Sequence, residues 1–270
     1  MSMNIHPTAV VSKKAELADG VIIGPYCIVD DKVKIGEGTE LKPFVHVCDY
    51  TAVGRNCIIM EHANIGAAPQ DLSYKGEVSY VVIGDRVTCR EFVTVNRAAG
   101  EGSSTVIGSD VLLMESVHVA HNVVIGNNIT IANKTGIAGH VHIDDFAVIG
   151  GMSGFHQFVH IGKYCMIGAM SRVVQDIPPF CLASGDPIKI YDINKIGLRR
   201  RGFEENQRTA IRRMYKLIYG SHLTVREGLA EIEKQYGETA EAKEILDFAA
   251  NATRGFAQRI KLAGRKEAQS

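Results

Sequence analysis

The sequence predicts a mainly β fold, in which a parallel β-helix of six-residue repeats over residues 1–187 precedes an α-helical domain over residues 188–270. Three observations predict it: an apolar residue at every sixth position, a glycine that often follows this residue, and a helical pattern beyond about Asn194. A period of six belongs neither to an α-helix nor to an amphipathic strand. It is typical of a β-helix in which three six-residue segments complete one coil.

The repeat runs from Ile5 to Val173 with two interruptions. Its apolar residues are Ile5, Val11, Leu17, Ile23, Val29, Ile35, Leu41, Val47, Val53, Ile59, Ile65, Ile83, Cys89, Val95, Ile107, Leu113, Val119, Ile125, Ile131, Ile137, Ile143, Ile149, Phe155, Ile161, Ile167 and Val173. We expect these side chains to point inward and to stack from coil to coil. We expect the glycines that follow them, such as Gly24 and Gly36, to occupy tight corners where φ is positive.

The interruptions are residues 66–82 and 97–106. Continuing the register through them would place Asp71, Glu77 and Glu101 at inward positions, where burying an unpaired carboxylate is unfavourable. The sequence therefore predicts loops that protrude from the β-helix. Loops on a rigid scaffold often carry binding residues, and a passive insertion is the alternative.

The repeat ends before the Pro178-Pro179 pair, which cannot continue a hydrogen-bonded strand ladder. Three helices are predicted beyond it, over residues 204–219, 224–236 and 239–251. The first carries a broad apolar stripe. Thr224 begins the second in a capping box, and Thr239 is a suitable N-cap for the third.

The composition favours a soluble cytoplasmic protein. The formal net charge is zero, whereas proteins that bind nucleic acid usually carry a basic excess. The six cysteines include no CxxC pair, so we expect reduced thiols and neither a zinc site nor disulfides. No signal peptide begins the sequence, and no apolar stretch approaches the roughly 20 residues of a membrane-spanning helix.

Several of the ten histidines fall at related positions of neighbouring coils. Residues 18 apart lie on the same side of successive coils, about 4.8 Å from each other. The repeat therefore brings His121, His140 and His156 to one edge, with His118 just before them. Histidine titrates near pH 6.5 and can take a proton from a hydroxyl at neutral pH, so this row is a candidate catalytic site.

Two kinds of chemistry suit the row of histidines. It contains no cysteine and the chain has no G-x-S-x-G motif, so direct attack of an acceptor on a bound acyl donor is simpler than an acyl-enzyme. The backbone N–H at Gly139-His140 would then suit a developing oxyanion. A zinc site is the alternative, and it requires three imidazoles that converge at about 2.1 Å from one point.

Basic residues concentrate directly after the repeat. Between Ile188 and Tyr219, nine basic residues oppose three acidic ones, and Arg199, Arg200 and Arg201 are consecutive. Guanidinium groups bind oxyanions in a bidentate manner, which suits a pyrophosphate or an acidic protein surface. A solvated charged face is the alternative.

These features together resemble one enzyme family. The matching segments follow in order along nearly the whole chain: Gln70-Asp71-Leu72, Val117-His118-Val119-Ala120-His121, Ala138-Gly139-His140-Val141, His156-Gln157-Phe158, Gln175-Asp176-Ile177-Pro178-Pro179 and Arg200-Arg201-Gly202-Phe203. The sequence resembles the UDP-N-acetylglucosamine 3-O-acyltransferases, which catalyse the first step of lipid A biosynthesis. Many acyltransferases share the six-residue repeat, whereas the set of histidine motifs is specific.

The resemblance implies a left-handed winding and a homotrimer whose active sites lie between neighbouring β-helices. It also implies that a 3-hydroxyacyl chain passes from acyl carrier protein to the sugar 3-hydroxyl, without a cofactor or a metal. By resemblance, His121 is the general base, the Gly139 N–H is the oxyanion donor, Arg200 favours acyl carrier protein, and the small Ala169 allows a fairly long acyl chain. The residues that would bind the sugar nucleotide are Asp71, His118, His140, His156, Gln157, Asn194 and Arg201.

Three positions depart from the family's usual pattern. Asn122 follows the base where the family commonly has aspartate, Asn96 stands where many members have histidine, and Ser73 stands where many have lysine. These departures leave open a transfer to a 3-amino variant of the sugar, which would form an amide instead of an ester.

Three further functions are alternatives. One is a metal-dependent hydratase on the same scaffold, resembling the γ-type carbonic anhydrases. Another is a non-catalytic scaffold or binding module. The third is the sister N-acyltransferase of the same pathway, which usually carries an extra N-terminal domain, whereas the repeats begin here at Ile5.

Overall fold

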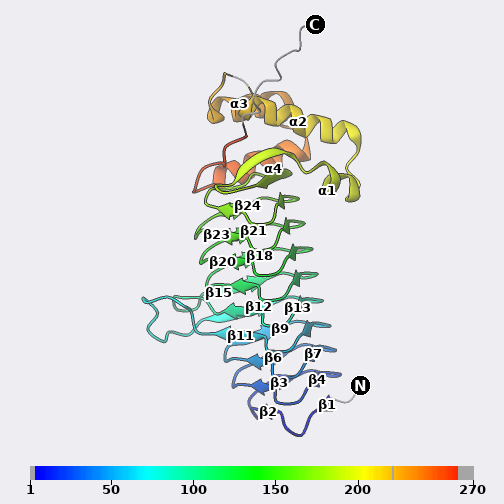
Figure 1. Cartoon of the computed structure of the whole chain (residues 1–270), viewed down its shortest axis with the longest axis vertical. Coiled ribbons are helices and arrows are strands. Elements are labelled where there is room, and N and C mark those ends of the chain that lie inside the picture. The colour runs from blue at the N-terminus through cyan, green and yellow to red at the C-terminus, as the bar shows by residue number, and fades with distance from the viewer. Residues whose placement is uncertain (1–3, 221, 261–270) are drawn as a thin grey trace.

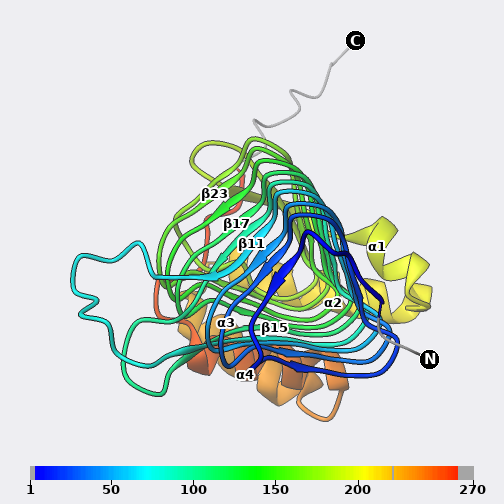
Figure 2. The same cartoon turned by 90° about the horizontal axis from the view of Figure 1, so that it is seen from below.

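The chain winds into a column of triangular coils, with helices packed at its C-terminal end (Figures 1 and 2). The computed structural model describes residues 4–220 and 222–260, so the outer ends of the two predicted domains lie outside the described residues. Three sheets of mostly two-residue parallel strands form the sides of the column. The predicted parallel β-helix is therefore confirmed.

From β1 to β26, successive strands belong to the three sheets in turn, here named A, B and C. Sheet A contains β1 (Asn4–Ile5), β4 (Ile22–Ile23), β7 (Glu40–Leu41), β10 (Ile58–Ile59), β13 (Thr88–Cys89), β16 (Leu112–Leu113), β19 (Thr130–Ile131), β22 (Val148–Ile149), β25 (Met166–Ile167), β27 (Cys181–Ser184) and β28 (Lys189–Ile193). Sheet B contains β2 (Val10–Val11), β5 (Ile28–Val29), β8 (His46–Val47), β11 (Asn64–Ala67), β14 (Thr94–Asn96), β17 (His118–Val119), β20 (Gly136–Ile137), β23 (Gly154–Phe155) and β26 (Arg172–Val173). Sheet C contains β3 (Glu16–Leu17), β6 (Lys34–Ile35), β9 (Thr51–Val53), β12 (Tyr80–Ile83), β15 (Ser104–Ile107), β18 (Val124–Ile125), β21 (His142–Ile143) and β24 (His160–Ile161). The chain thus turns at an A–B, a B–C and a C–A corner in every coil.

The core is the stack of aliphatic residues at every sixth position. From Ile23 to Val173 these side chains are buried, as the repeat predicts. Ile5 remains 41% exposed because no coil lies below the first one. All six cysteines are buried free thiols, so they pack as small apolar side chains.

The role predicted for the glycines is wrong except at Gly66, where φ is 93°. Positive φ occurs at the third residue after the inward aliphatic one, and this residue is usually not glycine, as at Tyr26 (φ 59°) and His62 (φ 61°). The glycines instead allow neighbouring coils to approach. A Cβ on Gly36 would lie 2.6 Å from the carbonyl of Gly54 in the next coil, which no side chain can tolerate.

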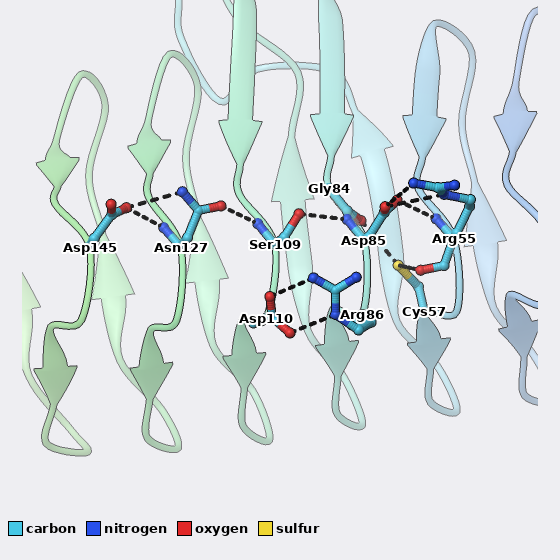
Figure 3. Close-up of polar contacts among 9 residues, drawn as sticks. All are labelled: Arg55, Cys57, Gly84, Asp85, Arg86, Ser109, Asp110, Asn127 and Asp145. Carbon is cyan, nitrogen blue, oxygen red and sulfur yellow. Dashed lines mark hydrogen bonds and ion pairs between the residues drawn. The ribbon is translucent and has the colours of Figure 1, made fainter. Parts of the chain in front are cut away.

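Side chains at the C–A corner tie each coil to the next (Figure 3). The side chain of Asp85 accepts a hydrogen bond from the Arg55 N–H at 2.8 Å, and the Ser109 hydroxyl accepts from the Asp85 N–H at 3.0 Å. Asn127 and Asp145 repeat this arrangement toward the C-terminal end, at 2.8 and 2.6 Å. The ladder satisfies corner N–H groups that the sheets leave unpaired.

The two segments predicted as loops leave the column at the B–C corner (Figures 1 and 2). The strands extend into both, because residues 66–67, 80–82 and 104–106 lie in β11, β12 and β15. The protruding parts are therefore residues 68–79 and 97–103. Both start immediately below the coil that carries the first histidines of the row.

Four helices follow β28: α1 (Lys195–Arg200), α2 (Glu205–Tyr219), α3 (Val225–Tyr236) and α4 (Ala240–Asn251). The three predicted helices are confirmed, including the capping box at Thr224 and the N-cap at Thr239. Strand β28, antiparallel to β27, lies in the part for which the sequence predicts helices. Among the described residues, no helix is both long and apolar enough to cross a membrane.

The close approach of coils predicts a stability difference between two glycines. Gly36→Ala should destabilise the protein by about 3 kcal/mol, because its Cβ forces two backbones apart. Thermal unfolding should then occur roughly 6 °C lower. Gly154→Ala is the matched control, since a Cβ there meets nothing within 4 Å, and it should leave the midpoint unchanged or slightly raised. Equal midpoints for the two variants would contradict this account.

Candidate active site

A groove of about 610 Å³ runs along sheet B at the B–C corner, above the two loops. Its lining residues are Gln70, His118, Ala120, His121, Gly136, Ile137, Ala138, Gly139, Gly154, Phe155, His156, Gln157, Arg172, Val173 and Val174. Gly136 and Gly154 are register partners on neighbouring strands, and a Cβ on either would meet nothing within 4 Å. Because two adjacent outward positions lack side chains, the floor forms a mostly apolar trough that suits an extended chain.

His121 lies against the backbone of the next coil. A Cβ on residue 139 would lie 2.5 Å from the His121 ring, so only glycine at that position leaves room for the ring. The ring meets His140 edge-on at 5.3 Å between centroids, and its side chain is 14% exposed. Within the described part of the chain, the Gly139 N–H has no hydrogen-bond acceptor, so it can bind an oxyanion beside His121.

Asn122 orients the His121 ring and holds the second loop. Its Oδ1 lies 2.8 Å from His121 Nδ1. The same amide accepts from the Ala99 N–H at 2.9 Å and donates to the Ala99 carbonyl at 3.0 Å. A carboxamide oxygen only accepts hydrogen bonds, so Nδ1 carries the proton and the Nε2 lone pair is available as a base.

Asp71, in the first loop, approaches the other nitrogen of the same ring. Its Oδ2 lies 3.8 Å from His121 Nε2. Its Oδ1 accepts from both the N–H and the hydroxyl of Ser73 at 2.8 Å, and these bonds lower the pKa of the Asp71 carboxyl. Ser73 thus holds the Asp71 carboxylate in place. The loop delivers a carboxylate to the edge of the groove.

The other histidines of the row have separate surroundings. His118 Nδ1 lies 2.7 Å from the Thr94 hydroxyl, and burial lowers the pKa of His118. His140 stacks on Phe158 at 4.7 Å, and its pKa is lowered by burial and by His121, while Asp71 acts in the opposite direction. His156 is exposed beside Gln157 at the upper part of the groove.

The histidine row does not form a zinc site of converging imidazoles. His121 is directed to Asn122 and Asp71, and His140 stacks on an aromatic ring. The clusters of potential ligands among the described residues lie elsewhere: Asp30, His46 and Cys48, and His142, Asp144 and His160. The arrangement at the groove suits proton transfer by one oriented imidazole.

Asn96 faces the base of the first loop and not the groove. It is 3% exposed, and its Nδ2 donates to the Ala68 carbonyl at 2.8 Å. Its role is therefore to hold the beginning of that loop against the column. This bond to the loop accounts for Asn96 at this position, and no contact between Asn96 and a ligand is required.

Six of the predicted site residues do not line the groove within one chain. Two of them, Asp71 and His140, lie beside the His121 ring, and the other four lie farther away. Asn194 caps α1 by accepting from the Gly197 N–H, and its amide donates to the Tyr164 carbonyl. The Arg201 guanidinium lies 4.8 Å above the Phe146 ring at the C–A corner. Arg200 is exposed on α1, and Ala169 is exposed at the A–B corner. These residues are on other sides of the column from His121.

The sequence analysis missed several residues of the groove. Arg172 lines its upper end and pairs with Asp186 at 2.6 Å, while Gly136 and Gly154 form its floor. Each of these three precedes an inward residue of sheet B, so the repeat itself places it outward. Applying the repeat to outward positions, as well as to inward ones, would have found them.

Two family models match the chain. Residues 176–257 match domain 2 of UDP-N-acetylglucosamine O-acyltransferase, and residues 104–139 match the bacterial transferase hexapeptide, described as six repeats. The two matches fall on the C-terminal region and on the coils that carry the groove.

Proteins similar over nearly the whole length extend these matches. The chain is 44% identical over 252 residues to the acyl-[acyl-carrier-protein]–UDP-N-acetylglucosamine O-acyltransferase of Thermodesulfovibrio yellowstonii, covering 93% of this chain and 98% of that protein. It is 43% identical over 251 residues to the protein of the same name from Chlamydia abortus, covering 93% and 90%. The solved UDP-N-acetylglucosamine acyltransferase of Francisella novicida superposes with a TM-score of 0.92 at 36% identity, covering 98% of this chain and 100% of that chain. The corresponding structure from Campylobacter jejuni gives 0.89 at 36% identity, covering 95% and 100%. Together with the hexapeptide match, these structures support the left-handed winding of the β-helix.

The surroundings of His140 predict how it titrates. Burial and His121 hold its pKa below the usual histidine range, so Asp71→Asn should lower it further, because a raising influence is removed. Glu37→Gln, on an exposed corner remote from the groove, should leave it unchanged. Histidine NMR titration measures both effects, and a higher His140 pKa in Asp71→Asn would contradict the placement of the carboxylate. Because the unfolded chain takes up this proton at higher pH than the folded one, His140 should reduce the free energy of unfolding as pH falls below about 6.5.

Proposed function

Since the chain belongs to the family of acyl-[acyl-carrier-protein]–UDP-N-acetylglucosamine O-acyltransferases, we propose that it transfers a 3-hydroxyacyl chain from acyl carrier protein to the 3-hydroxyl of UDP-N-acetylglucosamine. This reaction is the first step of lipid A biosynthesis. The strongest structural support is the His121 ring, whose protonated Nδ1 faces Asn122 and whose Nε2 side packs against Gly139 in a mostly apolar groove. The enzyme acts in the cytoplasm.

The proposed reaction needs one base and one oxyanion donor. His121 Nε2 takes the proton of the acceptor hydroxyl while the oxygen attacks the thioester carbonyl. The Gly139 N–H donates to the oxyanion of the tetrahedral intermediate. When the carbon–sulfur bond breaks, the imidazolium returns its proton to the leaving thiolate, so His121 is regenerated. No metal and no cofactor takes part.

Asn122 and Asp71 set the tautomer and the electrostatic surroundings of the proposed base, His121. Asn122 keeps His121 in the tautomer that presents Nε2, without adding the negative charge that an aspartate would supply. Asp71, at 3.8 Å from Nε2, stabilises the imidazolium by its charge. Its carboxylate also lies where the sugar hydroxyls would bind, together with His118, His156 and Gln157.

The acyl chain would lie in the trough above Gly136 and Gly154, where the walls are apolar. The family resemblance supports a homotrimer, in which a neighbouring chain supplies the predicted site residues that do not reach the groove within one chain. In that assembly Asn194 and Arg201 contact the nucleotide, Arg200 contacts acyl carrier protein, and Ala169 limits the length of the acyl chain. His140 supports His121 from the side.

A direct assay tests the proposed function. Purified protein should acylate UDP-N-acetylglucosamine from 3-hydroxyacyl carrier proteins and form an ester that mild alkali cleaves. The 3-amino variant of the sugar is assayed in parallel with the same panel of acyl-chain lengths. Turnover of the 3-amino sugar alone, with an alkali-stable amide product, would replace the proposed acceptor. Tight binding of carrier protein without turnover of either sugar would indicate a binding module.

The general base is tested by substitution. His121→Ala should lower kcat/KM by about 10²–10⁴, because proton transfer from the acceptor loses its base. His62→Ala is the matched control, since His62 is an exposed histidine at an A–B corner, outside the groove. Normal turnover by His121→Ala would exclude the proposed role.

A further inference from the structure

Two histidines and an aspartate converge on the outer face of sheet C. His142 on β21 and His160 on β24 are register partners, and their rings lie 4.6 Å apart between centroids. Asp144 Oδ1 lies 3.2 Å from His142 Nε2, and Asp144 Oδ2 lies 3.0 Å from His160 Nε2. Asp144 stands at a position that is glycine in the neighbouring coils, at Gly126 and Gly162.

The distances from Asp144 to the two imidazoles are near the ligand spacing of a small divalent cation. Zinc binds imidazole nitrogen and carboxylate oxygen at about 2.0–2.2 Å, which holds tetrahedral ligand atoms about 3.3 Å apart. The three potential ligand atoms all lie within 4.8 Å of one another. We propose that His142, Asp144 and His160 form a binding site for zinc or a similar divalent transition metal, separate from the acyl-transfer groove.

The cluster has both an entry path and a rigid support. The His142 side chain is 49% exposed, whereas Asp144 and His160 are 17% and 16% exposed, so a metal and its water ligand can enter from the His142 side. The Phe248 ring of α4 lies 4.4 Å from the His160 ring and fixes its orientation. The neighbouring Lys163 pairs with Glu244 at 2.7 Å, so its ammonium is engaged there.

The charges favour a metal over two protons. Two imidazolium groups whose ring centroids lie 4.6 Å apart would repel each other, and the Asp144 carboxylate lies against both rings. Neutral imidazoles and an ionised carboxylate are the forms that bind a transition metal. One divalent cation would neutralise the Asp144 carboxylate without requiring a proton on either imidazole.

The second potential cluster provides a contrast. Asp30 Oδ2 lies 3.0 Å from His46 Nε2, an arrangement like that of Asp144 and His160. Its third member is Cys48, whose burial raises the pKa of the thiol to about 11 and whose sulfur donates to Asn64 Oδ1. Metal binding needs the thiolate, which this surrounding disfavours. His46 is therefore a suitable control.

The proposed metal would join two successive coils at the end of the column where α4 packs. His160 belongs to the last strand of sheet C, and its backbone N–H donates to the Asp176 carboxylate at 2.8 Å. The other oxygen of Asp176 accepts from the Arg254 N–H, in the segment after α4. A cation at His142 and His160 thus stabilises the junction between the β-helix and the helical region.

The test is metal binding by the full-length chain, which does not depend on acyl transfer. The protein is stripped with a chelator and titrated with zinc chloride by calorimetry, and cobalt(II) is added as a visible-absorption probe. The wild type should bind about one metal per chain with a tetrahedral cobalt spectrum. His142→Ala and Asp144→Asn should each weaken binding at least tenfold, by analogy with the about 10–100-fold losses seen when metal sites are perturbed. The His142 and Asp144 side chains both reach the surface, so neither substitution should prevent folding. The thermal unfolding midpoint of each variant without metal checks this.

His46→Ala should bind zinc as the wild type does, and zinc should raise the thermal midpoint of the wild type but not of His142→Ala. Three results would overturn the proposal. These are no binding at about 0.1 mM zinc, a concentration well above a micromolar dissociation constant, unchanged binding in both His142→Ala and Asp144→Asn, and loss of binding in His46→Ala. The acyl-transfer assay is a separate measurement, so failure of either proposal leaves the other testable.

Discussion

The close contact between the backbones of successive coils is the constraint on which the rest of the structure depends. At the C–A corner, glycines such as Gly36 and Gly54 bring one coil against the next, and the ladder from Arg55 to Asp145 satisfies the N–H groups of that corner. Coil spacing is then fixed by covalent geometry and hydrogen bonds. Outward side chains of neighbouring coils consequently keep the same relative positions along the column.

The candidate active site uses this regularity and also departs from it. The regular coils align His121 with Gly139, so that the ring packs against the backbone of the next coil. The two loops break the repeat and return to the same corner, where they supply Asp71 and the Ala99 backbone. The regular coils align residues at equivalent positions, whereas the loops add the Asp71 carboxylate and the contacts of the Ala99 backbone. The proposed base, oxyanion donor and supporting charge therefore come from different parts of the chain.

Much of the fold and of the candidate site was predictable because one six-residue pattern repeats along the chain. The six-residue period predicts the sheets, the inward residues and the approach of His121 to His140, and helix caps such as Thr224 predict helix starts from local chemistry. The bond from Asn122 to Ala99 was not predictable, because it depends on how a loop folds back. The antiparallel strand β28 depends on pairing with β27 instead of on a repeat.

The glycines failed as indicators of positive φ for a related reason. Sequence alone does not distinguish a residue that needs conformational freedom from one that needs space beside another backbone. Tyr26 and Asn122 adopt the left-handed conformation although they carry side chains, because similar turns recur at the corners of the coils. The positions of Asn194 and Arg201 likewise follow from where α1 begins, which no periodic pattern specifies.

The two-residue strands also have an evolutionary consequence. Leu112 pairs with Thr130, eighteen residues further on, whereas Ile58 pairs with Thr88 across the longer coil that contains the first loop. Among the regular coils, a duplication or deletion preserves the strand pairing only if it adds or removes whole coils. At the B–C corner, by contrast, segments of different lengths leave the column and return without disturbing the register. Length variation among descendants of such a chain is thus directed to the edge of the groove, where it alters what the enzyme binds while the column stays intact.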